Sequence, residues 1–246
     1  MNLYTKRYFN KLFISTYNAA IIILKELYKI YQFKSIVDIG CGHGSWLKAA
    51  SQIIPNGRIY GVDGIYTKEL HTNIKADFKY INLEKKFTIN KFDLAISLET
   101  AEHLSPERAK SFIKDICNTS DVVFFSAAVD GHGGVNHLNE KNQSYWIKLF
   151  NDENYHPFIF LDRNKYWYHK SFKKCPYYIS GSFLYIKKGT RTYQNLIKYK
   201  LNKNDLTDII HPYILQWRKD ENFGVKLNFR RLIKSLILFL KRKLNF

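Results

Sequence analysis

A glycine-rich turn after a short apolar run is the segment best suited to hold a ligand. Asp38 lies in the run, and glycines follow at positions 40, 42 and 44. Glycines between a buried strand and a helix let backbone N–H groups approach a bound molecule closely. The spacing differs from the G-x-G-x-x-G pattern of dinucleotide sites, and no Lys-Ser/Thr pair of a phosphate-binding loop follows. The turn therefore predicts a small ligand other than a dinucleotide.

A second acidic residue, Asp63, ends the next apolar run, 25 positions after Asp38. A carboxylate at the end of a strand beside such a turn can accept hydrogen bonds from both hydroxyls of a ribose. The alternative is a turn-forming aspartate, because Gly64 follows it. The spacing from the glycine turn favours the ribose interpretation.

A third segment, FDLAISLETAEHL at 92–104, begins as an apolar strand and ends in polar residues. Its polar end is expected beside the glycine turn, since parallel strands deliver their carboxyl ends to one edge of a sheet.

These three segments together resemble the class I S-adenosylmethionine-dependent methyltransferases. VDIGCGHGSW at 37–46, GVDG at 61–64 and FDLAISLETAEHL occur in that family's order and spacing. A closer likeness is to small bacterial methyltransferases that accompany surface-polysaccharide biosynthesis. GGVNHLNE at 133–140, QSYW at 143–146 and IHP at 210–212 are similar to segments of those enzymes.

The resemblance implies a role for each matched residue. Asp38 and the loop of Gly40, Cys41, Gly42 and Gly44 would hold the amino-acid end of S-adenosylmethionine, and Asp63 with Gly64 its ribose. Asn82 stands where the family usually has Asp, near the adenine amino group, and its carbonyl oxygen can still accept a hydrogen bond. Ser97 and Glu99 would line the pocket beside the methionine moiety.

Methylation of a hydroxyl is helped by a general base, which typically contributes about 10²–10⁴-fold. Histidine suits this task because its pKa lies near neutrality. His103 lies near the end of the third segment, after Glu99 and Glu102, and His137 lies in a glycine-rich stretch where substrate is expected to enter, so both are candidate catalytic bases. For His103 the alternative is a structural role beside a neighbouring acid, and His132 is interpreted as a solvated loop residue.

A divalent metal site would need further ligands. Asp130, Glu99 and Glu102 could join the histidines, but no spacing typical of a metal site is present. The sequence therefore predicts no metal.

Elements of an α/β fold must position these residues. The apolar patterns predict strands at 35–39, 58–63, 78–81, 92–97, 121–126, 158–161 and 182–186, with helices at 5–32, 45–53 and 140–151. Ser105 and Pro106 predict the start of a further helix. Alternating strands and helices favour a Rossmann-like, doubly wound, mostly parallel seven-stranded sheet with helices on both faces.

Three regions are expected along the chain. An N-terminal helix at 1–32 packs on a cofactor-binding core at 33–188, and a helical C-terminal extension covers 189–246. The extension holds expected helices at 206–219 and 230–243. Three cysteines without paired spacing, together with the lack of a signal-peptide pattern, favour a cytoplasmic location.

The net charge of +18 favours an anionic partner, which would be a phosphate group, a nucleic acid or an anionic membrane surface. Residues 230–243 read as a basic amphipathic helix, which suits the inner face of an anionic membrane or docking on the domain. We expect the methyl acceptor to be a sugar or a glycan, either free or linked to a lipid. Nucleic-acid methylation, suggested by the charge, and an inactive methyltransferase-fold interaction protein are the alternatives.

Overall fold

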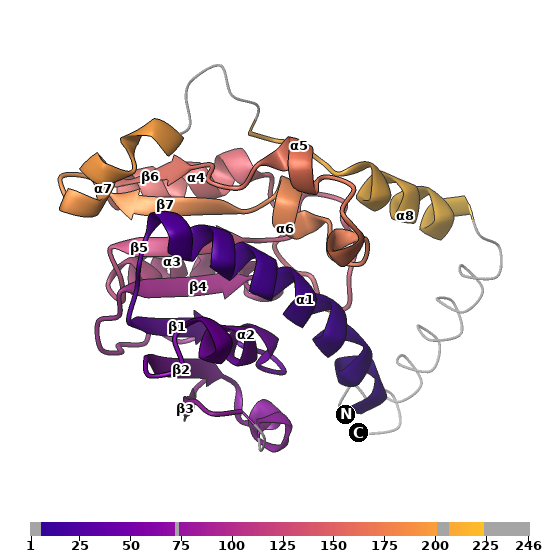
Figure 1. Cartoon of the computed structure of the whole chain (residues 1–246). Coiled ribbons are helices and arrows are strands. Elements are labelled where there is room, and N and C mark those ends of the chain that lie inside the picture. Colours follow the sequence, from indigo (N-terminus) through magenta and orange to yellow (C-terminus); the bar gives the residue numbers. More distant parts are fainter. Residues whose placement is uncertain (1–5, 72–73, 201–206, 224–246) are drawn as a thin grey trace.

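Seven strands form one mixed sheet in the order β3-β2-β1-β4-β5-β7-β6 (Figure 1). The structure is a computed structural model that describes residues 6–71, 74–200 and 207–223. The strands are β1 (Ser35–Ile39), β2 (Arg58–Asp63), β3 (Asp77–Tyr80), β4 (Leu94–Leu98), β5 (Val122–Ser126), β6 (Tyr155–Phe158) and β7 (Phe183–Lys187). All neighbouring pairs are parallel except those of β7, which runs antiparallel to both β5 and β6.

Helices connect these strands and cover both faces of the sheet. The α-helices are α1 (Lys6–Ile30), α2 (Ser45–Ile53), α3 (Ala109–Cys117), α4 (Gln143–Asp152), α5 (Arg163–Tyr166), α6 (Tyr177–Ser180), α7 (Arg191–Asn195) and α8 (Pro212–Phe223). Short 3₁₀ helices are η1 (Ile65–Leu70), η2 (Ala101–His103), η3 (Pro106–Arg108), η4 (Lys170–Phe172) and η5 (Ile197–Tyr199).

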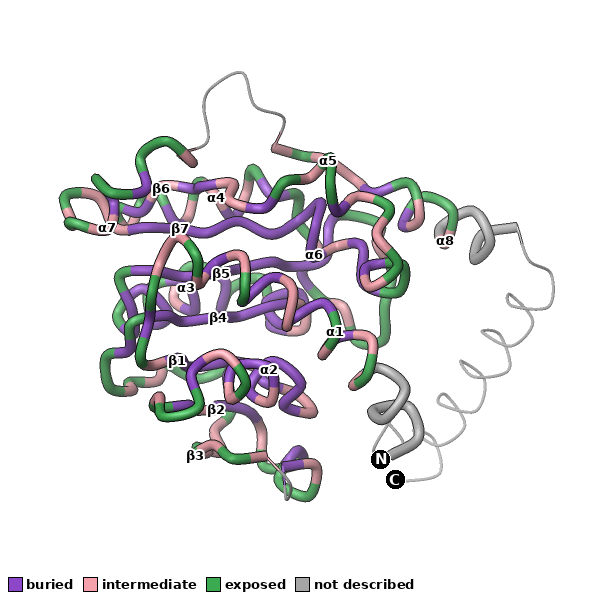
Figure 2. Tube along the Cα trace, viewed as in Figure 1, coloured by how far each residue is buried: buried purple, intermediate pink, exposed green. Residues whose placement is uncertain are grey.

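Alternation along the strands divides the apolar core into two layers, one on each face. Figure 2 shows that the central strands between these layers are buried along most of their length. Ile36 of β1 and Phe124 of β5 pack with helices α1, α2 and α6 on one face. Val37 and Phe125, the next residues along, pack with α3 and α4 on the other face. Because successive side chains of a strand point to opposite faces, a strand buried on both sides must be apolar throughout. This is why the continuous apolar runs of the sequence form the central strands.

The doubly wound, mostly parallel seven-stranded sheet confirms the predicted fold class. Strands β1 and β2 and helix α2 have the predicted bounds. Strands β3, β4, β5 and β7 begin or end one or two residues from the prediction, and α1 ends at Ile30, two residues earlier than predicted.

Three elements differ more clearly from the prediction. Strand β6 spans 155–158 rather than 158–161, because its register against antiparallel β7 pairs Tyr155 with Lys187. Helix α4 starts at Gln143, not at 140, and α8 starts at Pro212 instead of 206. Ser105 does precede a helical turn, but its hydroxyl donates to Glu84 Oε2 over 2.9 Å and caps no backbone N–H. The turn that it opens is 3₁₀, and α3 follows at Ala109.

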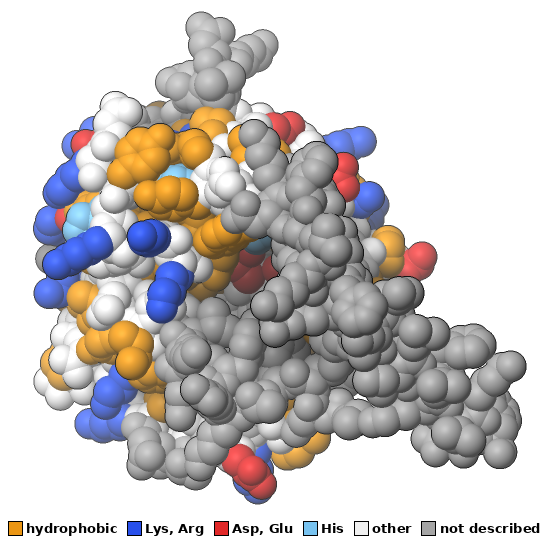
Figure 3. Space-filling view, turned by 90° about the vertical axis from the view of Figure 1, so that its right-hand side faces the viewer, with side chains coloured by type: hydrophobic (Ala, Val, Ile, Leu, Met, Phe, Trp, Pro, Cys, Tyr) orange, Lys and Arg blue, Asp and Glu red, His pale blue; other side chains and the backbone are white. Residues whose placement is uncertain are grey.

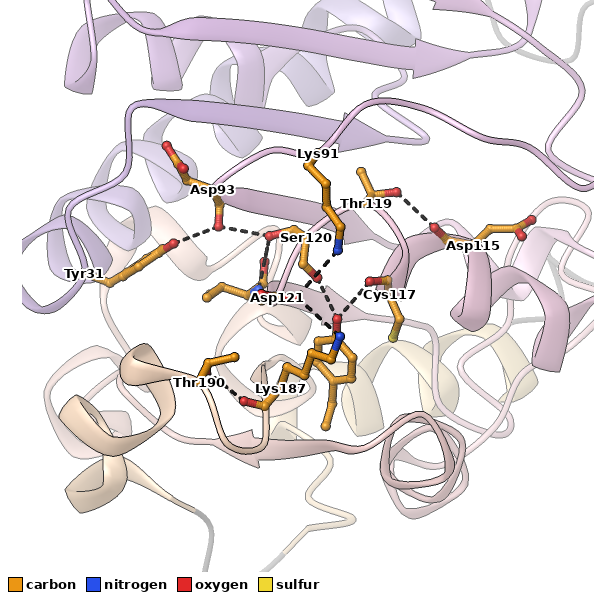
Figure 4. A network of polar contacts seen from close by, with 12 residues as sticks. Tyr31, Lys91, Asp93, Asp115, Cys117, Thr119, Ser120, Asp121, Lys187 and Thr190 are labelled. Atoms are coloured by element: carbon orange, nitrogen blue, oxygen red, sulfur yellow. Dashed lines mark hydrogen bonds and ion pairs between the residues drawn. The ribbon is translucent and has the colours of Figure 1, made fainter.

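A polar network holds the amino ends of β4 and β5 together (Figure 4). The Asp93 carbonyl oxygen accepts from the Tyr31 hydroxyl over 2.8 Å and from Ser120 Oγ over 2.9 Å. Lys91 and Lys187 flank Asp121 with N–O distances of 3.5 and 3.8 Å. The network ties α1, β4, β5 and β7 at the edge opposite the carboxyl ends of the parallel strands, so it stabilises the sheet rather than a ligand.

The described part of the C-terminal extension packs on the core. Helix α7 lies against β7, and Ile159 N–H donates to the Tyr199 carbonyl over 2.8 Å. Farther along the chain, His211 is buried. Its Nε2 atom lies 2.7 Å from the Trp167 carbonyl oxygen, and its ring stacks on the Trp167 ring. The expected amphipathic helix at 230–243 lies outside the described residues. Among the described helices, none is both long and apolar enough to span a bilayer.

Candidate functional site

The glycine loop (residues 40–44) leaves the carboxyl end of β1 at the edge of the sheet. Gly40, Gly42 and Gly44 have φ angles of 84°, 53° and 73°, the left-handed region that only glycine adopts at little cost. A Cβ on Gly40 would lie 2.2 Å from Thr100 Oγ1. A Cβ on Gly42 would meet no atom within 4 Å. The loop is therefore packed against the end of β4 at Gly40 and open at Gly42.

Asp63 ends β2 beside this loop, and its carboxylate binds the backbone on both sides. Asp63 Oδ2 accepts from Gly42 N–H over 2.6 Å, and Oδ1 accepts from Gly64 N–H over 2.6 Å and from the Tyr66 hydroxyl over 2.9 Å. Burial raises the pKa of this carboxyl, while the three donors oppose that rise. Asp63, the residue predicted to bind the ribose, thus lies where the glycine loop and β2 meet. Its side chain also accepts the hydrogen bonds that hold the turn after β2.

Asp38 of β1 lies beneath the loop, 3% exposed. Its Oδ2 atom is buried without a hydrogen-bond partner. Burial, together with the nearby Asp63 carboxylate, raises the pKa of Asp38 well above its ordinary value. A buried acceptor without a donor is costly unless a ligand supplies one. The ammonium group of an amino-acid ligand would do so, and therefore the residues fit the amino-acid end of S-adenosylmethionine.

The other predicted cofactor ligands lie along the same edge, with differing surroundings. Cys41 is buried, and burial raises the pKa of its thiol well above the ordinary value. Ser97 of β4 is fully buried, with no partner for its Oγ. Asn82 follows β3 and is exposed, and its Oδ1 accepts from Glu84 N–H over 2.9 Å. The Asn82 side chain therefore folds back on its own turn, where its predicted adenine contact has to compete with that bond.

His71 is a residue of this site that the sequence analysis missed. One ring nitrogen, Nε2, lies 2.7 Å from the Gly42 carbonyl oxygen, and the other, Nδ1, lies 3.3 Å from the Tyr80 hydroxyl. The ring stacks on Phe78 of β3 at 4.1 Å between centroids. His71, the residue directly after η1, thus contacts the glycine loop at Gly42. The sequence carries no signal for this contact, since His71 lies in no recognisable motif.

Glu99 follows β4 with a strained backbone, at a φ of 54°. Its Oε1 accepts from the Ser126 hydroxyl over 2.7 Å, which joins the ends of β4 and β5. Burial raises the pKa of Glu99 to about 7. Left-handed backbone at a non-glycine residue costs about 1–3 kcal/mol and concentrates at functional sites. This geometry agrees with the predicted place of Glu99 in the ligand pocket.

The two candidate bases, His103 and His137, come together although they are 34 positions apart. Their ring centroids lie 4.8 Å apart in an edge-to-face arrangement. His137 Nδ1 lies 2.6 Å from Glu140 Oε1, and His103 Nδ1 lies 3.3 Å from the Asn136 carbonyl oxygen. Burial and the neighbouring His137 lower the pKa of His103. His132 is half-buried rather than solvated, with its ring 6.1 Å from that of His137.

Comparison with known proteins supports the assignment made from these residues. A family model described as a methyltransferase domain matches residues 12–182. A putative methyltransferase, 235L of Invertebrate iridescent virus 6, is 25% identical over 139 residues, which are 54% of this chain and 52% of the viral protein. The chain thus spans about half the length of that curated relative.

Solved structures share the fold at low sequence identity. An O-methyltransferase family protein from Burkholderia thailandensis aligns with a TM-score of 0.57 at 11% identity, covering 76% of this chain and 61% of that one. Human N-acetylserotonin methyltransferase, solved with S-adenosylmethionine, aligns with a TM-score of 0.50 at 14% identity, covering 74% and 56%. These structures confirm the fold, and the family match shows that the chain belongs to the methyltransferase-domain family.

Proposed function

We propose that this protein is a methyltransferase that methylates a hydroxyl of a sugar or glycan. We call the glycine loop, Asp38 and Asp63 the cofactor cradle. The observation that carries the proposal is the pairing of His103 with His137, at 4.8 Å between ring centroids, in segments that follow strands β4 and β5 of the same sheet. S-adenosylmethionine, when bound, supplies an activated methyl group. The protein must then hold the acceptor in line, exclude water and take up the hydroxyl proton.

The roles of the residues follow from their contacts. Asp38 offers a buried, unpartnered oxygen to the ammonium group of the cofactor, and Asp63 offers its carboxylate to the ribose. His103 and His137 are the two candidates for accepting the hydroxyl proton. The lowered pKa of His103 keeps this imidazole neutral near pH 7, so that a ring nitrogen can act as a base.

A polar hollow beside the histidine pair suits a hydroxyl-rich acceptor. It has a volume of about 360 Å³ and is open to solvent. Its lining consists of Asp130, Gly133, Gly134, His137, Leu138 and Glu140. This stretch is also the one whose sequence resembles methyltransferases of surface-polysaccharide biosynthesis. Carboxylates and imidazoles that can bind sugar hydroxyls support the glycan over an apolar acceptor.

A labelled-methyl transfer assay tests the proposal. Full-length protein is incubated with labelled S-adenosylmethionine and with cell extract divided into glycan, nucleic-acid, lipid and small-molecule fractions. We expect label in the glycan fraction, and a 10²–10⁴-fold slower single turnover for His103→Ala or His137→Ala, the usual range for loss of a base. Label confined to nucleic acid would support the alternative that the charge of +18 suggests. Calorimetry that detects no cofactor binding would support the inactive-protein alternative.

We also propose that residues 230–243 contact the anionic inner face of a membrane, where a lipid-linked glycan would lie. The support is the sequence alone, RRLIKSLILFLKRK, with apolar and basic residues at helical spacing. Flotation of full-length protein with anionic liposomes is compared with flotation of a chain ending at Phe223. Equal flotation of the two chains removes this proposal.

A further inference from the structure

Three metal-ligating side chains converge beside the cofactor cradle, although their spacing in sequence predicted no metal site. One ligand atom each from Glu102, His103 and His137 lies within 4.8 Å of the other two. Glu102 and His103 belong to η2, directly after β4, whereas His137 comes from the long segment between β5 and α4. We call Glu102, His103 and His137 the three-ligand cluster.

Buried carboxyl groups without a lysine or arginine partner lie at this cluster. Glu102 is 1% exposed, and its Oε2 atom is buried without a hydrogen-bond partner. Within the described parts of the chain, neither Glu99 nor Glu102 forms an ion pair with a lysine or arginine. In a protein of net charge +18, buried carboxylates without a basic partner point to a cation from outside the chain.

The carboxyl edge of the sheet faces the viewer in Figure 3. There, a patch of acidic side chains lies recessed beside hydrophobic ones, while lysine and arginine side chains extend from the surface farther to the left.

Both histidines are held in the manner of metal ligands. His137 Nδ1 lies 2.6 Å from the Glu140 carboxylate, and His103 Nδ1 lies 3.3 Å from the Asn136 carbonyl oxygen. Metal-ligating histidines almost always donate one ring N–H to a carboxylate or a backbone carbonyl, which leaves the other nitrogen as a lone-pair donor. At Gly134, a Cβ would lie 2.2 Å from His137 Nε2, so that only glycine leaves room around this nitrogen.

Backbone hydrogen bonds fix the two segments of the cluster to each other. The Glu102 carbonyl oxygen accepts from Leu138 N–H over 2.7 Å and from Asn139 N–H over 3.0 Å. The residue after His137 is therefore bonded to the residue that supplies the carboxylate. A site whose ligands are brought together before the ion binds loses less free energy in ordering them.

We propose that Glu102, His103 and His137 bind a divalent transition-metal cation such as Mn²⁺, Co²⁺ or Zn²⁺. Two imidazoles with one carboxylate favour these ions over Mg²⁺ and Ca²⁺, which prefer oxygen ligands throughout. Binding of the cation does not depend on the proposed function. Its role does rest on that function: a cation here would hold the acceptor hydroxyl and lower the pKa of that hydroxyl, so that its proton could pass to water in the open hollow. The two histidines would then act as metal ligands in place of the base role proposed above.

The site is tested by calorimetry, in which metal-free, full-length protein is titrated with Mn²⁺ or Zn²⁺ alone. Co²⁺ gives a second readout through its visible absorption. We expect one ion per chain, with binding at least tenfold weaker in Glu102→Gln and in His137→Gln. Glu140→Gln is expected to weaken binding by about 10–100-fold, the usual effect of removing an outer partner of a ligand. His156→Gln on β6 is the matched control and should bind like the unaltered protein.

Circular dichroism melts and calorimetry with S-adenosylmethionine establish that each variant is folded. If Glu102→Gln does not fold, the result for His137→Gln decides, because His137 lies on a half-buried loop position. Absence of binding at micromolar concentrations of all three metals overturns the inference, as does unchanged binding in both ligand variants. Metal binding without methyl transfer to any fraction would overturn the proposed function and leave the metal site in place.

Discussion

Gly42 and Asp63, 21 positions apart, are joined by a hydrogen bond of 2.6 Å from the Gly42 N–H to Asp63 Oδ2. This bond links the glycine loop after β1 to the last residue of β2. Asp63, which we expect to bind the ribose, is thus also hydrogen-bonded to the loop that we expect to bind the amino-acid end of the cofactor. A change in either residue should therefore alter the other half of the cradle.

Replacement of Asp63 should weaken cofactor binding more than its charge alone explains. Asp63→Ala leaves Gly42 N–H, Gly64 N–H and the Tyr66 hydroxyl without their acceptor, in addition to removing the ribose ligand. We expect calorimetry to show an affinity for S-adenosylmethionine that is at least tenfold lower, or about 1.4 kcal/mol. Asp77→Asn, at the exposed start of β3, is the control and should retain the affinity. Equal affinities of both variants would contradict the assigned role.

Asp38 should make the ligand-free protein less stable as the pH rises. Burial raises the pKa of the folded carboxyl well above 3.8, so between these values the folded state holds a proton that the unfolded state has lost. Stability therefore falls with increasing pH across this window. Asp38→Asn removes the effect, and its Tm should exceed that of the unaltered protein by more at pH 7 than at pH 4. The same variant should bind S-adenosylmethionine more weakly, since a charged acceptor for the ammonium group is lost.

Thermal melts at several pH values, without cofactor, give the comparison for Asp38. A Tm difference that is constant from pH 4 to pH 7 would show that the carboxyl titrates alike in both states. In that case burial of the Asp38 carboxyl would not lower the stability of the folded protein as the pH rises.

The glycines of the loop should differ in their tolerance of alanine. Gly40→Ala places a Cβ 2.2 Å from Thr100 Oγ1 at a φ of 84°, so that strain and overlap combine. Gly42→Ala meets open space, and only the left-handed backbone opposes it, at about 1–2 kcal/mol. Urea unfolding should show a larger loss of stability for Gly40→Ala. A larger loss of stability for Gly42→Ala would contradict the close packing of Thr100, after β4, against Gly40.

Arg108 should matter for folding and not for ligand binding. Its Nη2 lies 2.5 Å from Asp115 Oδ2, and its Nε donates to the Leu83 carbonyl over 2.9 Å, with 4% of the arginine side chain exposed. Removing one partner of a buried ion pair costs about 3–5 kcal/mol, because the other charge is left without compensation. Arg108→Ala should therefore lower the midpoint of urea unfolding.

The double variant Arg108→Met with Asp115→Leu should recover part of the stability lost in Arg108→Ala, since it leaves no buried charge. Affinity for S-adenosylmethionine should stay unchanged in every variant that is folded. A selective loss of affinity in folded Arg108→Ala would show that this pair shapes the site.

Local patterns along the chain predicted the fold, whereas the roles of the predicted cofactor residues stay predictions. Continuous apolar runs defined the central strands because those strands are buried on both faces. The predictions failed by three to six residues at β6, α4 and α8, where the bounds depend on pairing and packing with distant residues. The register of β6 against β7 is an example, since nothing within residues 155–161 specifies it.

The sequence by itself determined the strand–glycine turn–helix unit and the acid at the end of β2, since both are formed by residues adjacent in the chain. Only the tertiary structure joined Gly42 to Asp63 through a hydrogen bond and placed His71 under the loop. It also brought His137 to Glu102 and His103, where the spacing had predicted no metal. Ligands from different strand ends meet because parallel strands share one carboxyl edge, a relationship that the linear spacing of residues does not encode.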